Sequence, residues 1–285
     1  MSASLRPLLL TTLAMLAFAA NSVLCRQALK LTSLDAATFT SVRLLSGALA
    51  LLAILTIRGR VQRQRQGNWG SALMLFVYAA AFSFAYLSLA TGTGALLLFG
   101  AVQMTMVFAG LRAGERLQAG QWAGLAGALG GLVYLVLPGL EAPSPQGAAG
   151  MLMAGVAWGL YSLRGRATTD PVGATAGNFL RATPMALLLS LFTLFWFRPD
   201  PHGMLYAVLS GAVTSGVGYV IWYAALPHLR ATQAATVQLS VPVLAALGGI
   251  LLLGEPLTTR LVLASVAILG GIAAVLWFRS GRPIR

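Results

Sequence analysis

The stretch "LRAGERL" (Leu111–Leu117) and the stretch "LLLGEPL" (Leu251–Leu257) lie 140 residues apart and share a Leu, a Gly-Glu pair and a second Leu. The same offset matches residues elsewhere along the chain. The matches pair Phe18 with Trp158, Ser22 with Ser162, Arg26 with Arg166, and "LGGL" (Leu129–Leu132) with "LGGI" (Leu269–Ile272). Several matches in one order and one register indicate an internal repeat. We therefore predict two related halves, residues 1–140 and residues 141–285.

The composition is that of a membrane protein. Hydrophobic residues make up 58% of the 285 positions and charged residues only 9%, whereas about a quarter of the residues in a soluble domain are charged. The single cysteine, Cys25, allows no internal disulfide. The chain has only two histidines besides this cysteine, so the sequence contains no Cys/His cluster for a metal. We expect no metal and no cofactor.

About 20 apolar residues are needed to cross a bilayer as a helix. Dividing the chain where charged residues and prolines interrupt the apolar runs gives ten predicted spans, and helices are the form that satisfies their backbone groups in lipid. The spans are Pro7–Leu24, Ala36–Ile57, Gly70–Ala90, Thr93–Leu111, Ala119–Leu137, Gly147–Leu163, Val172–Phe197, Met204–Leu226, Ala231–Leu253 and Arg260–Phe278. The predicted fold is an all-α integral membrane protein.

The basic residues predict the orientation. With the N-terminus inside, the inside segments hold Arg6, Arg58, Arg60, Arg63, Arg65, Arg112, Arg116, Arg164, Arg166, Arg230, Arg279, Arg282 and Arg285. The outside ends hold only Arg26, Lys30, Arg198 and Arg260. This bias predicts an inner-membrane protein with both termini in the cytoplasm. The net charge of +13 then reflects topology, and we expect no nucleic-acid partner.

Five spans per half is an odd number, so the second half enters the membrane from the opposite side. Inverted repeats are typical of secondary transporters, which bind substrate near the membrane midplane between the halves. Glu115 and Glu255 follow the fourth and ninth spans. We expect each to cap the next helix or to pair with Arg116 or Arg260, and a gate contact is the alternative.

These features together resemble the EamA branch of the drug/metabolite transporter superfamily. The resemblance rests on the ten spans, the Gly-Glu-x-Leu repeats, an aromatic residue followed by Ser in the first and sixth spans, and Arg43 and Arg181 in the second and seventh. It implies a ten-helix exporter, and the aromatic-rich spans are most similar to the YddG-type exporters of aromatic and other neutral amino acids. The chain departs from the family pattern at Val102, because the proline expected in both the fourth and ninth spans occurs only as Pro242.

Polar residues at mid-span are the first candidates for substrate binding. An amide in hydrocarbon is costly unless it is hydrogen-bonded, so each one bridges two helices or faces a wet cavity. The candidates are Asn21, Ser22, Gln103, Gln238 and Ser240. Arg43 and Arg181 lie inside spans. An arginine there faces a path for a substrate carboxylate, or it snorkels to the membrane surface or binds carbonyl oxygens of a neighbouring helix.

Aromatic residues at mid-span are the second group of candidates. They suit an apolar or aromatic substrate side chain, and helix packing is the alternative. The group consists of Tyr78, Phe82, Tyr86, Phe99, Trp158, Tyr161, Tyr219, Trp222 and Tyr223.

The sequence therefore predicts a secondary transporter that exports small metabolites, most of all amino acids, and that catalyses no covalent chemistry. A permease for sugars, nucleotide derivatives or drugs is the alternative within this fold. An integral membrane enzyme is the more distant alternative, because it would need a nucleophile, acid/base or metal set at one depth. The last span of each half carries few polar groups and the small-residue "LGG" face, and we assign it to packing or to a weak subunit contact.

Overall fold

The computed structural model describes residues 5–60, 62, 66–114, 116–139, 141–165, 168–229 and 231–279. In this part of the chain every regular element is helical, as expected. The first half forms α1 (Leu5–Leu31), α2 (Ala36–Ile57), α3 (Trp69–Ala85), α4 (Thr91–Arg112) and α5 (Ala119–Val136). The second half forms α6 (Pro145–Gly165), α7 (Pro171–Phe192), η2 (Leu194–Trp196), α8 (Pro201–Val208), η3 (Leu209–Val217), α9 (Gly218–Ala225), η4 (Leu226–His228), α10 (Ala231–Gln238), α11 (Ser240–Leu253) and α12 (Thr259–Arg279).

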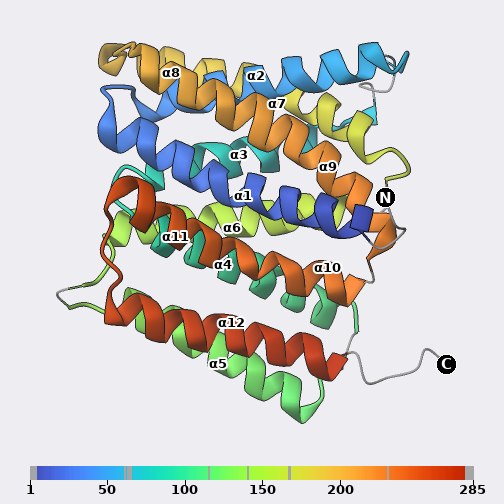
Figure 1. Ribbon diagram of the computed structural model, residues 1–285, viewed down its shortest axis with the longest axis vertical. Helices are drawn as coiled ribbons and strands as arrows, with labels where there is room; N and C mark the ends of the chain where they lie inside the picture. Colours follow the sequence, from blue (N-terminus) through green and yellow to red (C-terminus); the bar gives the residue numbers. More distant parts are fainter. Residues whose placement is uncertain are drawn as a thin grey trace.

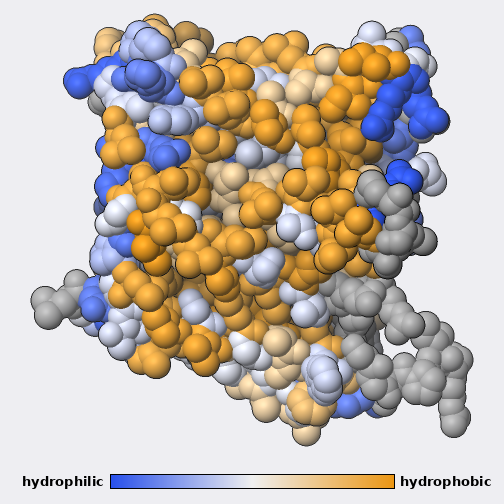
Figure 2. All heavy atoms as spheres, in the orientation of Figure 1, coloured by the Kyte–Doolittle hydropathy of each residue, from blue (hydrophilic) through white to orange (hydrophobic). Residues whose placement is uncertain are grey.

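The helices lie side by side as one bundle (Figure 1). The start of α1 and the end of α12 lie at the same end of this bundle. Among the described residues, seven helical segments are long and apolar enough to cross a membrane, and Trp69–Ala85 is a shorter apolar helix. Figure 2 shows an apolar surface across the middle of the bundle and hydrophilic residues gathered at its two ends. The surface pattern is that of a multi-pass membrane protein.

The packing of the two halves is related by the repeat. Helix α3 of the first half packs on α6 of the second half. In the same way, the segment α8–η3–α9 of the second half packs on α1 of the first. Likewise α4 packs on α6, and α11 packs on α1, while α2 pairs with α7 and α5 with α12. Each contact thus recurs with the roles of the halves exchanged, which is the arrangement of an inverted two-repeat transporter.

The helices α5 and α12 form a pair at one edge of the bundle (Figure 1). Their backbones approach closely, because a Cβ atom at Gly131 would lie 2.8 Å from Ala267 Cβ and one at Gly271 would overlap the Gly124 carbonyl oxygen. Gly130 has open space in place of such a neighbour. One glycine of the "LGG" motif therefore serves packing within the chain.

Local capping explains where several helices begin. The side chains of Asp35, Asn68, Asp170 and Asp200 each accept a hydrogen bond from the backbone N–H three residues later, which satisfies an unpaired donor of the first turn.

The C-terminal ends of some helices differ from those of the predicted spans. Helix α1 runs on past Leu24 to Leu31, and α3 ends at Ala85 rather than Ala90.

The eighth span is irregular. Its centre, η3, is a π-helix that packs against α2. A Cβ at Gly211 would overlap the Arg43 carbonyl oxygen and Ser46 Oγ, so glycine permits this close approach of two backbones. Segments of π-helix occur frequently at functional sites. Here Thr214 and Ser215 of the segment line a cavity inside the bundle.

Candidate functional site

A cavity lies at the centre of the bundle, between the two halves. It is lined by Phe18, Asn21, Ser22, Tyr78, Phe82, Leu98, Phe99, Trp158, Thr214, Ser215, Tyr219 and Gln238. These residues come from α1, α3 and α4 of the first half and from α6, η3, α9 and α10 of the second. The cavity leaves ≈ 30 Å³ for the centres of water molecules, which is room for about two waters. A metabolite therefore needs the helices to separate before it can bind.

Stacked aromatic rings form one wall of the cavity. The Trp158 ring lies 4.9 Å from that of Tyr78 and 5.4 Å from that of Tyr219, centroid to centroid. Phe18, the repeat partner of Trp158, contacts Tyr219 at 5.8 Å. Ring faces and edges in this arrangement suit an apolar or aromatic group placed between them.

Another part of the cavity lining is polar, and Asn21 joins several of its groups. The Asn21 Oδ1 atom accepts hydrogen bonds from Ser210 Oγ at 2.6 Å and Thr214 Oγ1 at 3.3 Å, and Nδ2 donates to the Tyr78 hydroxyl at 3.4 Å. The amide of α1 thus links η3 to α3. Both alternatives for Asn21, bridging helices and facing the cavity, hold at once.

Arg43 lies directly behind this polar wall. It is 1% exposed. Its Nη2 donates to the Tyr78 hydroxyl at 3.0 Å, its Nε donates to Ser215 Oγ at 3.4 Å, and its guanidinium lies over the rings of Tyr78 and Phe82. The described hydrogen-bond partners of Arg43 are hydroxyl groups. The expectation that Arg43 binds carbonyl oxygens of a neighbouring helix is therefore wrong.

Arg181 does not reproduce the setting of Arg43. Its side chain is half-buried and donates to the Gly177 carbonyl oxygen at 2.9 Å, within its own helix. The two arginines lie in equivalent spans of the two halves but differ in surroundings.

Six of the candidate residues are buried or half-buried outside the cavity lining. Tyr86 donates to the Thr91 carbonyl oxygen at 3.2 Å, Tyr161 and Tyr223 lie beside Asn178 and Thr175, and Ser240 donates to the Val237 carbonyl oxygen at 2.7 Å. Trp222 contacts Phe18 at 6.0 Å, and Gln103 is buried within α4. These positions are those of packing or of support for the lining.

Four lining residues escaped the sequence analysis as candidates, namely Phe18, Leu98, Thr214 and Ser215. Phe18 had a signal, because it aligns with Trp158 in the repeat. Thr214 and Ser215 lie in the stretch "SGAVTSGVG" (Ser210–Gly218), whose hydroxyls and glycines inside an apolar span also mark a polar site.

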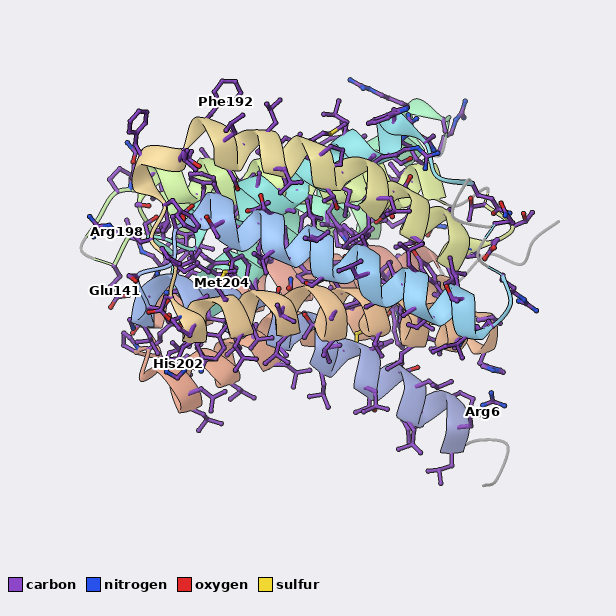
Figure 3. All side chains as sticks on the ribbon, turned by 90° about the horizontal axis from the view of Figure 1, so that it is seen from above. Arg6, Glu141, Phe192, Arg198, His202 and Met204 are labelled. Atoms are coloured by element: carbon purple, nitrogen blue, oxygen red, sulfur yellow. The ribbon has the colours of Figure 1, made fainter. Side chains whose placement is uncertain are left out.

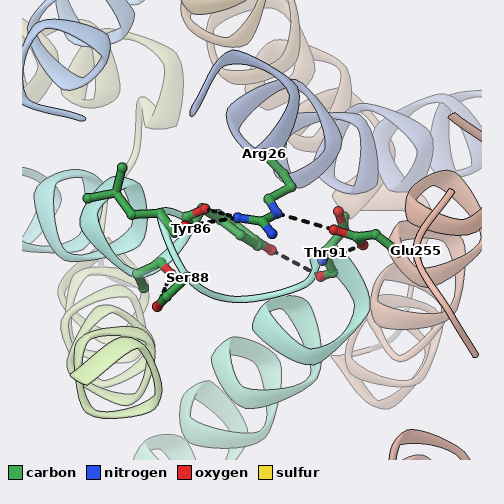
Figure 4. Close-up of polar contacts among 7 residues, drawn as sticks. Arg26, Tyr86, Ser88, Thr91 and Glu255 are labelled. Atoms are coloured by element: carbon green, nitrogen blue, oxygen red, sulfur yellow. Dashed lines mark hydrogen bonds and ion pairs between the residues drawn. The ribbon is translucent and has the colours of Figure 1, made fainter. Parts of the chain in front are cut away.

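An ion pair lies one helical turn beyond the lining residues Ser22 and Phe82 (Figure 4). Arg26 Nε lies 3.2 Å from Glu255 Oε1, and Arg26 Nη1 donates to the carbonyl oxygens of Tyr86 and Leu87 at 2.7 and 3.1 Å. Glu255 Oε2 accepts from the Thr91 N–H at 2.7 Å. This contact joins the ends of α1, α3 and α4 to the loop before α12.

The contacts of Glu255 correct two expectations. Glu255 caps α4, in the other half, rather than the next helix α12, because Ala90 at the N-cap of α4 offers no side-chain acceptor. Its ionic partner is Arg26 rather than Arg260, whose backbone N–H instead donates to Glu141. Glu115 lies outside the described residues.

A second cavity adjoins the same ion pair. It leaves ≈ 200 Å³ for the centres of water molecules and is lined by Ser88, Thr93, Glu141, Ser144, Glu255 and Thr258, among others. Ser22 and Phe82 line the central cavity, and Arg26 and Tyr86 follow them by one helical turn. The layer that contains the ion pair therefore lies between the two cavities.

Comparison with known proteins decides the family. A sequence model of the EamA-like transporter family matches this chain twice, over residues 5–137 and again over residues 145–277. The chain belongs to the EamA-like transporter family.

Relatives of this EamA protein occur in distant prokaryotes. It is 58% identical over 280 residues, 98% of both chains, to an uncharacterised protein of Pseudomonas aeruginosa. It is 24% identical to an uncharacterised transporter of Bacillus subtilis, YoaV, over 82% of this chain and 85% of the relative. A solved crystal structure with 20% identity superposes with a TM-score of 0.66 over 94% of this chain and 96% of the other, which shows the same fold. The protein is thus an EamA-family membrane transporter.

Proposed function

We propose that this EamA protein exports small metabolites, and specifically aromatic and other neutral amino acids, as the YddG-type exporters it resembles do. The observation that carries the proposal is the central cavity, whose lining combines stacked rings with amide and hydroxyl groups. An apolar side chain would lie against Trp158 and Tyr219, and the polar backbone of the substrate would meet Asn21 and Gln238.

The lining favours amino acids over the alternative substrates of this fold. A sugar or nucleotide derivative has hydroxyls over most of its surface, and a site for it needs hydrogen-bonding groups along most of its walls. Here the walls combine Phe18, Phe82, Phe99 and Leu98 with a few amide and hydroxyl groups. That mixture matches a molecule with one apolar and one zwitterionic part.

Alternating access would operate through the layer of Arg26 and Glu255. In this conformation the layer separates the central cavity from the cavity at the Glu141 end. Breaking the ion pair would free α1 and α3 from α4 and from the loop before α12, and would join the two cavities. The opposite end would close in the same cycle, as in other inverted repeats.

The proposed orientation places the ion pair on the periplasmic side. Arg6 lies at one end of the bundle, and Arg198, Glu141 and His202 lie at the other (Figure 3). With the positive-inside rule the Arg6 end is cytoplasmic. A reporter fused after Arg285 should then read cytoplasmic, and a periplasmic signal there would reverse the proposed orientation.

Uptake into liposomes tests the substrate. Purified protein is reconstituted, and labelled phenylalanine, leucine, glucose, a nucleoside and an organic cation are supplied in turn. We expect uptake of the two amino acids above that of protein-free liposomes, and competition of each by the other. Uptake of the sugar or nucleoside alone would replace the proposed substrate class by the alternative one.

A further inference from the structure

Arg43 carries a buried charge whose hydrogen bonds are incomplete. An arginine is protonated at any working pH and offers five N–H donors. In α2 its Nε and Nη2 atoms bond to Ser215 and Tyr78, while its buried Nη1 atom has no hydrogen-bond partner. A buried donor without a partner costs free energy, so the site calls for another acceptor.

The described carboxylates do not supply that acceptor. Asp35, Asp170 and Asp200 accept backbone N–H groups at helix starts, Glu141 accepts from the Arg260 N–H, and Glu255 pairs with Arg26. All five lie at the ends of the bundle. A buried charge that lacks an opposite charge is strongly unfavourable, so among the described residues Arg43 is a cation without a resident anion.

The position of Arg43 directs its charge toward the central cavity. Tyr78, Phe82 and Ser215, which contact the guanidinium, all line that cavity. The guanidinium is therefore one side chain behind the wall. A ligand in the cavity would reach the guanidinium if Tyr78 rotated or η3 moved, because these two elements separate the charge from the cavity.

We propose that Arg43 binds the carboxylate of the substrate, and hence that this transporter selects carboxylate-bearing molecules with an apolar or aromatic side chain. The inference rests on the proposed function in that it uses the central cavity as the substrate site. A guanidinium binds a carboxylate through two parallel hydrogen bonds, so the substrate supplies both the missing acceptor and the missing charge. The rings around Trp158 hold the other end of the molecule.

The test uses ligands that share one ring and differ in one group. Detergent-purified protein is heated with 3-phenylpropionate, 3-phenylpropionamide or 2-phenylethylamine, and the shift in Tm gives the apparent affinity of each. We expect wild-type protein to be stabilised by the carboxylate at concentrations at least ~10-fold lower than by the amide. Equal stabilisation by carboxylate and amide would overturn the inference.

Variants assign the effect to Arg43. Arg43→Met removes the charge and keeps a long side chain, and replacing an uncompensated buried charge in this way should leave Tm unchanged or higher. It should lose the preference for the carboxylate. Arg43→Lys keeps the charge without the planar fork of the guanidinium. It should weaken binding of the carboxylate and leave binding of the amide unchanged, so it tests the role of Arg43 even if the methionine variant is unstable. Arg181→Gln is the matched control and should keep the wild-type preference; a variant at Arg43 that also keeps it contradicts the inference.

Uptake separates this inference from the proposed function. If liposomes take up no amino acid while the carboxylate preference is present and lost in Arg43→Met, the amino-acid proposal fails and the Arg43 site stands. If liposomes take up phenylalanine and phenylalaninamide equally well, and Arg43→Met does the same, the transporter stands and the Arg43 site fails.

Discussion

The fourth and ninth spans occupy equivalent places in the two halves and differ in continuity. Helix α4 runs unbroken from Thr91 to Arg112, whereas the ninth span is divided into α10 and α11 at Leu239. Pro242 contributes to the break, because a proline has no N–H to donate to the carbonyl oxygen of Gln238 four residues earlier. Val102, at the aligned position of α4, keeps its N–H.

The two spans also differ in the polar group that they present to the cavity. Gln238 lies at the end of α10 and lines the cavity, while Gln103 is buried in the continuous α4 and does not line it. Two amides that both lie at mid-span thus have different surroundings. The comparison teaches that one half supplies a rigid helix and the other a jointed one around a shared site.

Val102→Pro should break this difference with the largest effect. A proline inside α4 removes the hydrogen bond to Leu98 and clashes with that turn, which costs about 3 kcal/mol or more. The same turn packs on α6, where a Cβ at Gly155 would lie 2.6 Å from the Leu98 carbonyl oxygen. We expect the yield of folded protein and the Tm in detergent to fall sharply, and a variant as stable as wild type would show that α4 tolerates a joint.

Glu255→Ala should have the next largest effect. The change removes the acceptor for the Thr91 N–H and leaves Arg26 without its carboxylate. Because Arg26 keeps two carbonyl partners, we expect the free energy of unfolding to fall by only about 2 kcal/mol. The sole cysteine, Cys25, is buried beside Arg26. It therefore reports opening, and N-ethylmaleimide should label it several-fold faster in the variant. Glu141→Gln, at an exposed acid of the same end, is the control and should leave the labelling rate unchanged.

Gln238→Ala and Gln103→Ala compare the two amides directly. We expect Gln238→Ala to raise the KM for transport by about tenfold, the value of one hydrogen bond to a polar substrate group. Gln103→Ala should change KM less and lower Tm more, because Gln103 is enclosed within the helix packing. The reverse order would place the substrate on the α4 side of the cavity.

Much of the fold could be predicted from the sequence because the lipid environment imposes simple rules. The apolar runs give the spans, and the 140-residue repeat gives the two inverted halves. The ends of helices were harder to predict. Helix α1 continues past Leu24 because Arg26 finds an acid and two carbonyl oxygens from other segments, and no local pattern contains that information.

The candidate site was predictable in kind and less so in detail. Mid-span aromatics and amides did lead to the cavity residues Asn21, Tyr78, Trp158 and Gln238. Periodicity alone could not separate them from Tyr161 or Tyr223, because the sorting depends on how the helices cross. The partner of Glu255 was also out of reach, since Arg26 lies 229 residues away in the chain.

Pro242→Ala sharpens the comparison with the smallest effect on stability. Alanine restores an N–H that can bond to the Gln238 carbonyl oxygen, so the ninth span can become continuous as α4 is, and we expect Tm to change by no more than a few degrees, upward if the span straightens. Straightening would shift Gln238 at the cavity wall and stiffen the joint, so kcat for uptake should fall several-fold while the protein stays folded. The matched control is Pro184→Ala in α7, where the proline lies inside a helix that has no break; it should leave kcat unchanged. If both variants transport at the wild-type rate, the joint at Leu239 is a feature of packing, and the two halves are alike in function despite their difference in shape.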